Sequence, residues 1–592
     1  MRRFAERLVC GVILAFGALM VALTVRADDF FTVDVTYFEL ARSMIVDGSY
    51  GFSSQPIAQP PGFPALLAFV CVAASCSYKV LIRIVAVGAT LGLLTSYKLL
   101  RREHGPAFAG VVCILLASSP SLFKFSTRLD FSDAPYFFAS MAALVAASRL
   151  ERARRLRARV ALGLLCGFFL VGSVLIRSAG LALVIGLGGW LAASWWADRE
   201  GASRRLKTFL PLLLAGLVVQ ASWMHWGPRP PLEWPSVGGY PQSYLAQLTV
   251  KSGNRPELGT VSLSDVPARV AQNVKDRMAF VMVLLTHLRA EWFSALVPGL
   301  AVLMLTGVWV SLRRGGGSWP AWYFVGHEAM YAVWPWNFEE RFFLPVAPLA
   351  CLYLWRGAQA TVDAASRQPR VVGAASCVVA VFSAAAAGAE IWASGSWRPI
   401  PAAIVGAVLA ITCAWVAWTG RHQLPPLWSR WPSSSTVVVS ALGRPLTFRT
   451  LSGAVALVVL VGIGVVREVS AGRENLAFDV TREATYPDVE AGRWIHAHTP
   501  ATAVVMARQL DVVYHYGRRR VVWFPPLRDP QQLMEGIRRH RVEFVVVIDR
   551  ESSYWLPPEG DCFNELTRAY PGRFGLVHES PRLKIFRVSG DS

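Results

Sequence analysis

Apolar runs of about 15 to 24 residues recur along most of this chain, from residue 5 to residue 466, and short polar stretches separate them. A helix needs about 20 apolar residues to cross the hydrocarbon core of a bilayer, so runs of this length predict membrane-spanning helices. The predicted fold class is therefore a polytopic α-helical membrane protein. We expect about thirteen spans, near residues 5–25, 80–100, 106–120, 131–149, 160–177, 180–197, 206–226, 291–312, 319–336, 342–356, 371–394, 400–419 and 450–466.

One further apolar run, at residues 57–76, is predicted not to cross. Pro56, Pro60, Pro61 and Pro64 crowd its start, and proline removes backbone donors that hydrocarbon cannot replace. If this run stays on one side and the N-terminus is inside, basic loops such as "KLLRREHG" and "RLERARRLRAR" all face the cytoplasm, as the positive-inside rule requires. If the run crossed, the pattern would invert. We therefore expect it to lie at the outer interface or to re-enter.

This orientation leaves three polar regions outside a plasma or inner membrane. They are a first outer loop at 26–79 that holds two surface helices, a second loop at 227–290, and the tail at 467–592, which follows a transmembrane module at 1–466. The C-terminus is then extracytoplasmic. The sequence leaves open whether residues 1–27 are a first span or a cleaved signal peptide, and the topology downstream is the same in both cases.

The tail has a different pattern. Short β-branched runs ("TAVVMA", "RRVVWF", "EFVVVID" and "RLKIFRV") alternate with helix-like stretches such as "DVEAGRWIHAHT" and "DPQQLMEGIRRHR". Strands that alternate with helices predict a small α/β domain.

Composition agrees with a membrane protein, since 54% of the residues are hydrophobic and 17% are charged, against roughly 25% charged in soluble domains. The net charge of +20 lies in short loops rather than on one face, which argues against nucleic-acid binding. The nine cysteines show no zinc-type spacing. We expect nearly all of them to be small apolar core residues.

Two acidic clusters fall on the outer side at span boundaries. In "FTVDVTYFELARSMIVDG", Asp34 starts a short amphipathic helix that carries Tyr37, and "STRLDFSDAPYFF" places Asp130 and Asp133 before the fourth span. Each acid can simply cap a helix. For Asp34, the residues alone favour neither a cap nor an active-site acid. The two clusters can also converge on one cavity.

Two arginines stand at the same edge. Arg177 lies in "LIRSAG", a very short outer turn, and Arg341 lies in "NFEERFFLPVAPL" at the start of the tenth span. An arginine there can snorkel to headgroups, or its planar fork of donors can bind a phosphate. Taken singly, each arginine is better explained by snorkelling.

Together these stretches resemble the GT-C superfamily of integral-membrane glycosyltransferases, and more narrowly the aminoarabinose-transferase and protein-O-mannosyltransferase-like family. The resemblance covers most of residues 28–356 in one order. It is carried by "DVTYFELARSMIVDGSYGF", "QPPGFPALLA", "LDFSDAPYFFASMAAL", "GFFLVGSVLIRSAGLAL" and "ERFFLPVAPLACLYL". It implies transfer of a sugar from a polyprenyl-phosphate donor to a glycan, lipid or protein acceptor on the outer side of the membrane.

The resemblance also assigns residues. The family's first-loop acid corresponds to Asp34, with Tyr37 beside it in the substrate site. That acid usually lies four residues before the tyrosine, and here it lies three before. The departure leaves Asp28 and Asp29 as alternatives.

The family's second acid corresponds to Asp133, with Asp130 as its neighbour. Many relatives carry a lysine on the donor phosphate at the position that Gln59 occupies here. Arg177, Arg341, another cation or a divalent metal ion must then take its place.

The chemistry explains why one good carboxylate suffices. Glycoside hydrolysis needs two carboxylates, one of them to protonate a poor leaving group, whereas a lipid phosphate leaves readily and needs only charge stabilisation. Our hypothesis makes Asp34 the general base toward the acceptor and puts an arginine or a metal on the phosphate. Asp133 would orient the acceptor or hold the metal. Attack opposite the phosphate predicts inversion at the anomeric carbon.

Two other classes share some of these features. A transporter or flippase of lipid-linked sugars also has many spans and intramembrane arginines, but usually shows paired repeats, which this sequence lacks. A sensor built around the tail would not need acids in the first outer loop.

Overall fold

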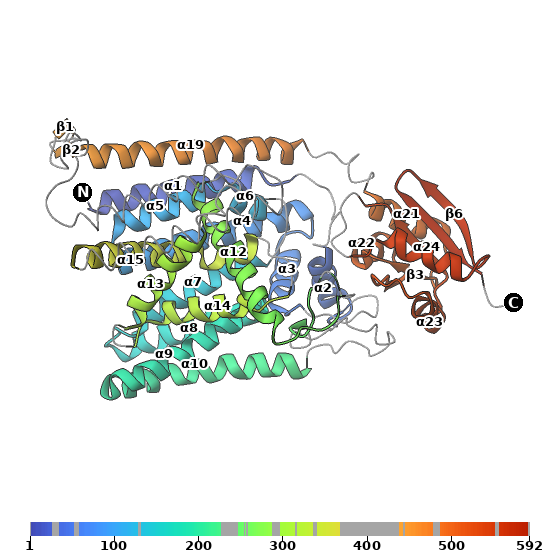
Figure 1. Ribbon diagram of the computed structural model, residues 1–592, viewed down its shortest axis with the longest axis horizontal. Helices are drawn as coiled ribbons and strands as arrows, with labels where there is room; N and C mark the ends of the chain where they lie inside the picture. The colour runs from blue at the N-terminus through green and yellow to red at the C-terminus, as the bar shows by residue number, and fades with distance from the viewer. Residues whose placement is uncertain are drawn as a thin grey trace.

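A computed structural model of the chain describes residues 2–25, 35–51, 59–127, 132–226, 247–253, 255, 258–286, 297–313, 316–335, 340–367, 437–441, 444–477, 486–550 and 556–589. Helices form one long body, and a smaller α/β domain lies at one end of it (Figure 1). The helices of the body are α1 (Arg2–Ala22), α2 (Val35–Val46), α3 (Gly62–Ala73), α4 (Tyr78–His104), α5 (Pro106–Ala117), α6 (Pro120–Thr127), α7 (Asp133–Leu150), α8 (Leu156–Ile176), η1 (Ser178–Gly180), α9 (Leu181–Ala197), α10 (Arg199–Trp226), α12 (Asp265–Thr286), α13 (Val297–Arg313), α14 (Trp319–Ala332), η4 (Glu340–Phe342), η5 (Leu344–Val346), α15 (Ala347–Arg367) and α19 (Phe448–Leu476).

The prediction of a polytopic helical membrane protein is confirmed. Within the described residues, five helices are long and apolar enough to cross a bilayer: α1, α4, α8, α9 with η1, and α10. The pair α5 and α6 makes a sixth candidate, bent by 57°. Helices α7, α13, α14, α15 and α19 overlap other predicted spans. The predicted spans at 371–394 and 400–419 lie outside the described residues, so the number thirteen stays a prediction.

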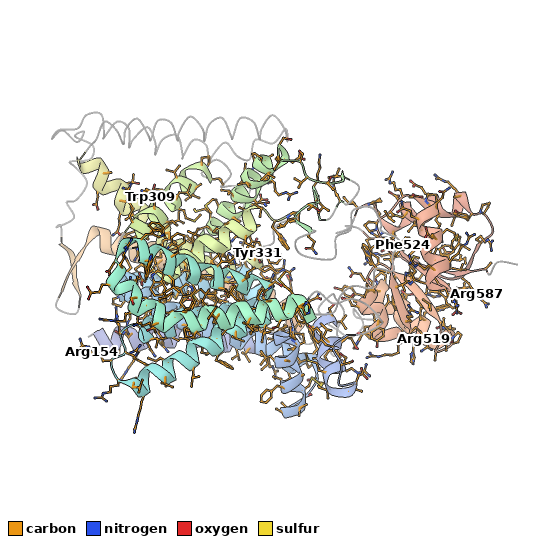
Figure 2. The ribbon with its side chains drawn as sticks, turned by 90° about the horizontal axis from the view of Figure 1, so that it is seen from below. Arg154, Trp309, Tyr331, Arg519, Phe524 and Arg587 are labelled. Carbon is orange, nitrogen blue, oxygen red and sulfur yellow. A yellow bond between two sulfur atoms is a disulfide. The ribbon has the colours of Figure 1, made fainter. Side chains whose placement is uncertain are left out.

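The first predicted inner loop is a tight turn. Arg101, Arg102 and His104 occupy the last turn of α4, where cations suit the negative end of the helix dipole. Gly105 then ends the helix with φ of 95°, a value that favours glycine. Pro106 starts α5 at once, as its fixed φ allows. Figure 2 shows Arg154, in the next basic loop, at the end of the body opposite the α/β domain.

The run predicted not to cross forms α3. It has 12 residues, and at about 1.5 Å per residue it is far shorter than the roughly 30 Å of the hydrocarbon core. One face of α3 is buried through Phe63 and Leu67, while Phe69 and Val72 are exposed. This is the pattern of a helix that lies against the bundle.

A disulfide joins Cys71, in the last turn of α3, to Cys76 in the loop that follows. Our expectation of small apolar core residues is therefore wrong for these two, although Cys113, Cys166 and Cys351 are free and buried. Disulfides persist in oxidising compartments, which agrees with an outer location for this loop.

Part of the loop predicted at 227–290 is a helix of the bundle. Helix α12 buries Met278, Val281 and Leu284 and packs on α13 and α14. The sequence prediction missed this apolar stripe because α12 begins with polar residues, from Asp265 on.

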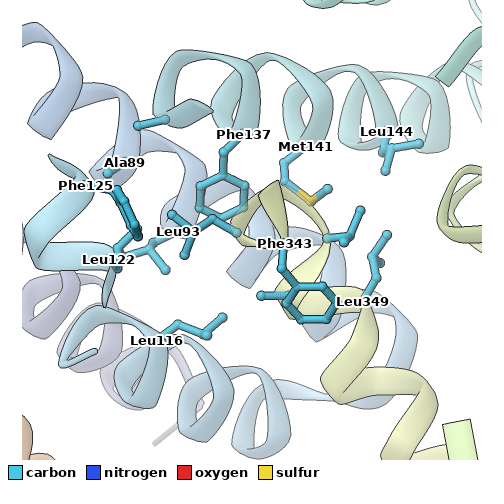
Figure 3. Close-up of a cluster of buried hydrophobic side chains, with 14 of the residues drawn as sticks. Ala89, Leu93, Leu116, Leu122, Phe125, Phe137, Met141, Leu144, Phe343 and Leu349 are labelled. Atoms are coloured by element: carbon cyan, nitrogen blue, oxygen red, sulfur yellow. The ribbon is translucent and has the colours of Figure 1, made fainter. Parts of the chain in front are cut away.

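The core of the bundle packs α7 against α4 and against the turn between η4 and η5. Figure 3 shows Phe137 and Met141 of α7 beside Leu93 of α4 and Phe343, which lies between η4 and η5. A Cβ added at Gly92 would lie 2.4 Å from the Phe137 ring, so α4 and α7 are in close contact there. This packing holds the start of α7 and the η4 turn in one place.

The α/β tail is confirmed in outline. Its five-stranded sheet has the order β4-β3-β5-β7-β6, with β3 parallel to β4 and β5 and with β7 antiparallel to β5 and β6. The strands and helices of this domain are α21 (Pro487–His498), β3 (Val504–Ala507), α22 (Leu510–Gly517), β4 (Arg520–Trp523), α23 (Pro530–His540), β5 (Phe544–Ile548), α24 (Glu559–Ala569), β6 (Phe574–Ser580) and β7 (Leu583–Val588). The sequence prediction missed β6, α22 and α24. It also missed the hairpin of β1 (Val437–Ala441) and β2 (Arg444–Thr447).

Alternation along the strands gives the sheet two cores. Val505 and Val546 face α21 and α22, whereas Val504 and Val545 face α23 and α24, as the two-residue period of a strand requires. Helix α19 runs on to Leu476, past position 466, where we placed the start of the tail.

The domain contacts the bundle through α22 and α2 (Figure 1). Leu40 of α2 packs against Leu510 and Tyr514. The Thr36 hydroxyl donates to Asp511 Oδ2 at 2.5 Å. Burial raises the pKa of Asp511 from 3.8 to about 6, although the hydrogen bond from Thr36 lowers it.

The raised pKa of Asp511 predicts how Asp511→Asn changes the stability of the protein. Because the folded pKa is raised, the contribution of Asp511 to stability is complete below pH 3.8 and is lost as the pH rises through about 6. Asparagine carries no charge, and its amide can donate to Thr36. We expect the variant to be more stable than wild type at pH 7.5, by on the order of 1–3 kcal/mol.

Thermal unfolding in detergent at pH 4 and pH 7.5 measures this. The gain should appear at pH 7.5 and shrink at pH 4. A gain that is absent at pH 7.5, or larger at pH 4, would contradict the assignment.

Candidate active site

Four elements bring their ends together where the bundle faces the α/β domain. They are α2, the start of α7, the turn after α8, and η4. They contribute Tyr37, Ser132, Asp133, Arg177 and Arg341. Tyr37 and Asp133, one from each outer stretch that the sequence singled out, therefore lie close to the two arginines.

The centre of the cluster is a buried ion pair. Arg177 Nη1 lies 2.9 Å from Asp133 Oδ2, and the two side chains are only 17% and 2% exposed. The same nitrogen donates to Ser132 Oγ at 3.2 Å. Ser132 makes no side-chain capping hydrogen bond to α7. The structure thus assigns Ser132 and Asp133 to Arg177 rather than to the helix end, and Arg177 does not snorkel.

The turn after α8 aims Arg177 at this acid. Arg177 is the C-cap of α8 with extended backbone, φ −154° and ψ 138°. Its amide still donates to Ser173 O at 3.1 Å, and its carbonyl accepts from the Gly180 amide at 2.8 Å. The very short turn predicted from "LIRSAG" therefore leaves one non-helical residue, whose side chain can leave the helix axis.

The "QPPGFP" stretch places Tyr37. Phe63 of α3 makes an edge contact with the Tyr37 ring, with centroids 5.0 Å apart. A Cβ at Gly62 would lie 2.6 Å from the carbonyl carbon of Leu175, so only glycine lets α3 approach the end of α8 this closely. The Tyr37 hydroxyl then lies 3.3 Å from Ser132 Oγ.

Arg341 joins the cluster through an aromatic ring. The guanidinium carbons of Arg177 and Arg341 lie 5.0 Å and 4.9 Å from the centre of the Phe342 ring. The two carbons are therefore within about 10 Å of each other. Tyr331 stacks on Phe342, with centroids 5.6 Å apart and ring planes 20° apart. Figure 2 places Tyr331 inside the helical body.

The electrostatics favour an anion. The Arg177 guanidinium lies beside the Asp133 carboxylate, which stabilises its charge. Burial raises the pKa of Tyr37, although the charges of Arg177 and Arg341 lower it. Tyr37 is neutral and can donate. Among the cluster residues that the structure describes, two guanidiniums stand against one carboxylate, so their net charge is positive.

Of the remaining predicted site residues, the structure describes Gln59 alone. Asp34, Asp28, Asp29 and Asp130 lie outside the described residues. Gln59 is described, and its carbonyl accepts from the Tyr50 hydroxyl at 2.7 Å. Among the described residues, no contact links its side chain to the cluster.

Sequence reasoning missed the layer beneath the cluster. Arg277 of α12 is buried, pairs with Glu328 of α14, and lies 5.0 Å from the Tyr331 ring. His327 Nδ1 is 3.2 Å from Arg277 Nη2. The signal that could have revealed this layer is the pair His327 and Glu328 inside a predicted span, since ionisable residues in membrane helices usually have a function.

In the part of the chain that the structure describes, no three His, Cys, Asp or Glu side chains gather as a metal site. Asp133 is the acid that our hypothesis gave either to the acceptor or to a metal, and in the structure it pairs with Arg177.

Comparison with solved structures identifies the fold. The chain is similar to ArnT from Cupriavidus metallidurans, both in the apo state and bound to undecaprenyl phosphate. Each comparison has a TM-score of 0.52 and 15% identity, and covers 98% of this chain and 97% of the other. This chain has the GT-C fold.

A second GT-C structure agrees. The apo oligosaccharyltransferase from Archaeoglobus fulgidus matches with a TM-score of 0.50 and 14% identity, over 98% of this chain and 74% of that one. No family model and no curated protein matches the chain. Coverage of 98% of this chain means that both comparisons include the α/β domain.

The ion pair makes a stability prediction. Removing one partner of a buried pair leaves an uncompensated charge and costs about 3–5 kcal/mol. We expect Asp133→Asn and Arg177→Met each to lower the unfolding midpoint in detergent, and the double variant to lose less than the two losses combined.

The matched control is the more exposed pair Arg205–Glu151. Breaking such a pair costs about 0–1 kcal/mol. Equal effects of Arg205→Met and Arg177→Met, or strictly additive losses at Asp133 and Arg177, would show that the buried pair is not a unit.

Proposed function

We propose that this protein is a glycosyltransferase. It moves a sugar from a polyprenyl-phosphate donor to an acceptor on the outer face of the membrane, with inversion at the anomeric carbon. The observation that carries the proposal is the positive cluster of Arg177 and Arg341 around Phe342, held by Asp133.

The cluster suits the leaving group of this reaction. As the glycosidic bond breaks, negative charge grows on the lipid phosphate. Fixed guanidiniums in a partly buried site stabilise that charge without reorganising. ArnT, which shares the fold, was solved with undecaprenyl phosphate. We propose that Arg177 and Arg341 take the place of the family lysine that Gln59 replaces.

Two features support the outer location. The disulfide Cys71–Cys76 ties the end of α3 to the loop after it, and disulfides persist in oxidising compartments. Arg154 lies at the opposite end of the body from the α/β domain (Figure 2), in a basic loop typical of the cytoplasmic side. We therefore place the cluster and the tail domain outside.

The proton acceptor in this proposal is Asp34. It stands three positions before Tyr37, whose hydroxyl lies in the cluster. The pairing of Asp133 with Arg177 suggests that Asp133 holds the phosphate-binding arginine rather than the acceptor. One further carboxylate is then enough for the reaction, because the phosphate needs no proton to leave.

A transfer assay tests the proposal. Purified protein in detergent is given a panel of polyprenyl-phosphate sugars, with native membrane extract as acceptor. We expect transfer by the wild type, a loss of about 10²–10⁴-fold in Asp34→Asn, and a loss of about 10²–10³-fold in Arg177→Met. NMR of the product reports the anomeric configuration.

Arg528→Met is the control, because Arg528 is 62% exposed in the tail domain and should not matter. Full activity in Asp34→Asn would exclude it as the base. No transfer with any donor, together with movement of lipid-linked sugar across vesicles, would favour a transporter instead.

A further inference from the structure

Helix α2 is held from two sides. Tyr37 points to the cluster, where it meets Phe63 and Ser132. Thr36, Glu39 and Leu40 meet the α/β domain instead. Residues three and four apart share one stripe of a helix, so α2 presents one stripe to the donor site and another to the domain.

The domain-facing stripe contains a buried carboxylate. The Glu39 side chain is 2% exposed. Its Oε1 lies 2.5 Å from His515 Nδ1, and Arg518 Nη1 donates to both oxygens at 2.9 and 3.0 Å. Burial raises the pKa of Glu39, but His515 and Arg518 lower it by more, to below its ordinary value. Glu39 is therefore ionised, and its strongest partners belong to the domain.

The domain is shaped to make this contact. Arg518 ends α22 in the left-handed region with φ of 48°, which is uncommon for a residue other than glycine. This turn lets the arginine at the helix end reach Glu39. The His515 ring also makes an edge contact with Phe38, with centroids 5.7 Å apart.

If the contact between α2 and the domain served only to hold the two together, apolar residues would do so at a lower free-energy cost, since ionised groups are costly to bury. A charged contact is also more directional than an apolar one. Because both oxygens of the carboxylate accept hydrogen bonds, the contact fixes the rotation of α2 as well as its position. Glu39 is two residues from Tyr37. Small misplacements at a reacting centre are costly.

We infer that the α/β domain is a positioning element for the donor site, and that it acts through Glu39, His515 and Arg518 on α2. This inference rests on the proposed function. Glu39 is a positioning residue: it contacts the domain, and its effect reaches the site through Tyr37.

The test uses the full chain in detergent with Glu39→Gln, Arg518→Gln and the double variant. The control is Glu579→Gln, which breaks the pair with Lys584 where both side chains are 53% exposed. Two properties are measured: amide hydrogen exchange over α2 without ligand, and equilibrium binding of undecaprenyl phosphate.

We expect each single variant to speed exchange in α2 at least tenfold and to weaken binding about tenfold. Exchange in β3 and β5 should stay as in wild type, which shows that the domain remains folded. The double variant should bind undecaprenyl phosphate as well as the single variant with the lower affinity, because both substitutions break the same contact. The control should match wild type in both properties.

Unchanged exchange in α2 would overturn the inference, and so would faster exchange with wild-type binding. Variants that also speed exchange in β3 and β5 would reduce Glu39 to a folding role and overturn it too. Failure of wild type itself to bind undecaprenyl phosphate would instead reject the proposed function, so the two failures are distinguishable.

Discussion

A charge buried near the membrane must have a partner, and the ion pair of Arg177 with Asp133 sets much of what surrounds it. The pair ties the turn after α8 to the start of α7. With its acid already engaged, Arg177 keeps a fixed orientation over Phe342, and Arg341 meets the same ring from η4. A single constraint thus produces a rigid positive site rather than two flexible arginines.

The rest of the bundle supports this arrangement. The contact of Gly62 with the end of α8 brings Phe63 under Tyr37, and the packing of Phe137 and Phe343 (Figure 3) fixes α7 and η4. Helix α2 lies between this cluster and the α/β domain and contacts both. The positioning role that we infer for the domain depends on this placement.

Much of the fold could be predicted from sequence, because its strongest signals are local. Long apolar runs, basic loops and alternating strands predicted the bundle, the surface helix α3 and the tail sheet. The predictions failed where burial depends on partners. Helix α12 begins with polar residues and buries an apolar stripe only against α13 and α14, and the exposed edge strand β6 lacks a clear alternating pattern.

The site followed the same rule. The sequence singled out Asp133, Arg177 and Arg341 because each stands at a span boundary on one side, and Tyr37 through the family resemblance. Their pairing could not be deduced, since it depends on the extended backbone at Arg177. Phe342 was missed because an aromatic residue beside an arginine is ordinary in sequence. Glu39 was missed because only the folded tail reveals its partners.

The most direct measurement is an experimental structure with undecaprenyl phosphate bound. We predict phosphate oxygens within hydrogen-bond distance of Arg177 and Arg341, next to the Tyr37 hydroxyl. Near the other end of α4 and α13, Arg356 and His104 line a cavity of about 700 Å³. A phosphate found in that cavity, with Arg177 and Arg341 unaltered, would contradict the account.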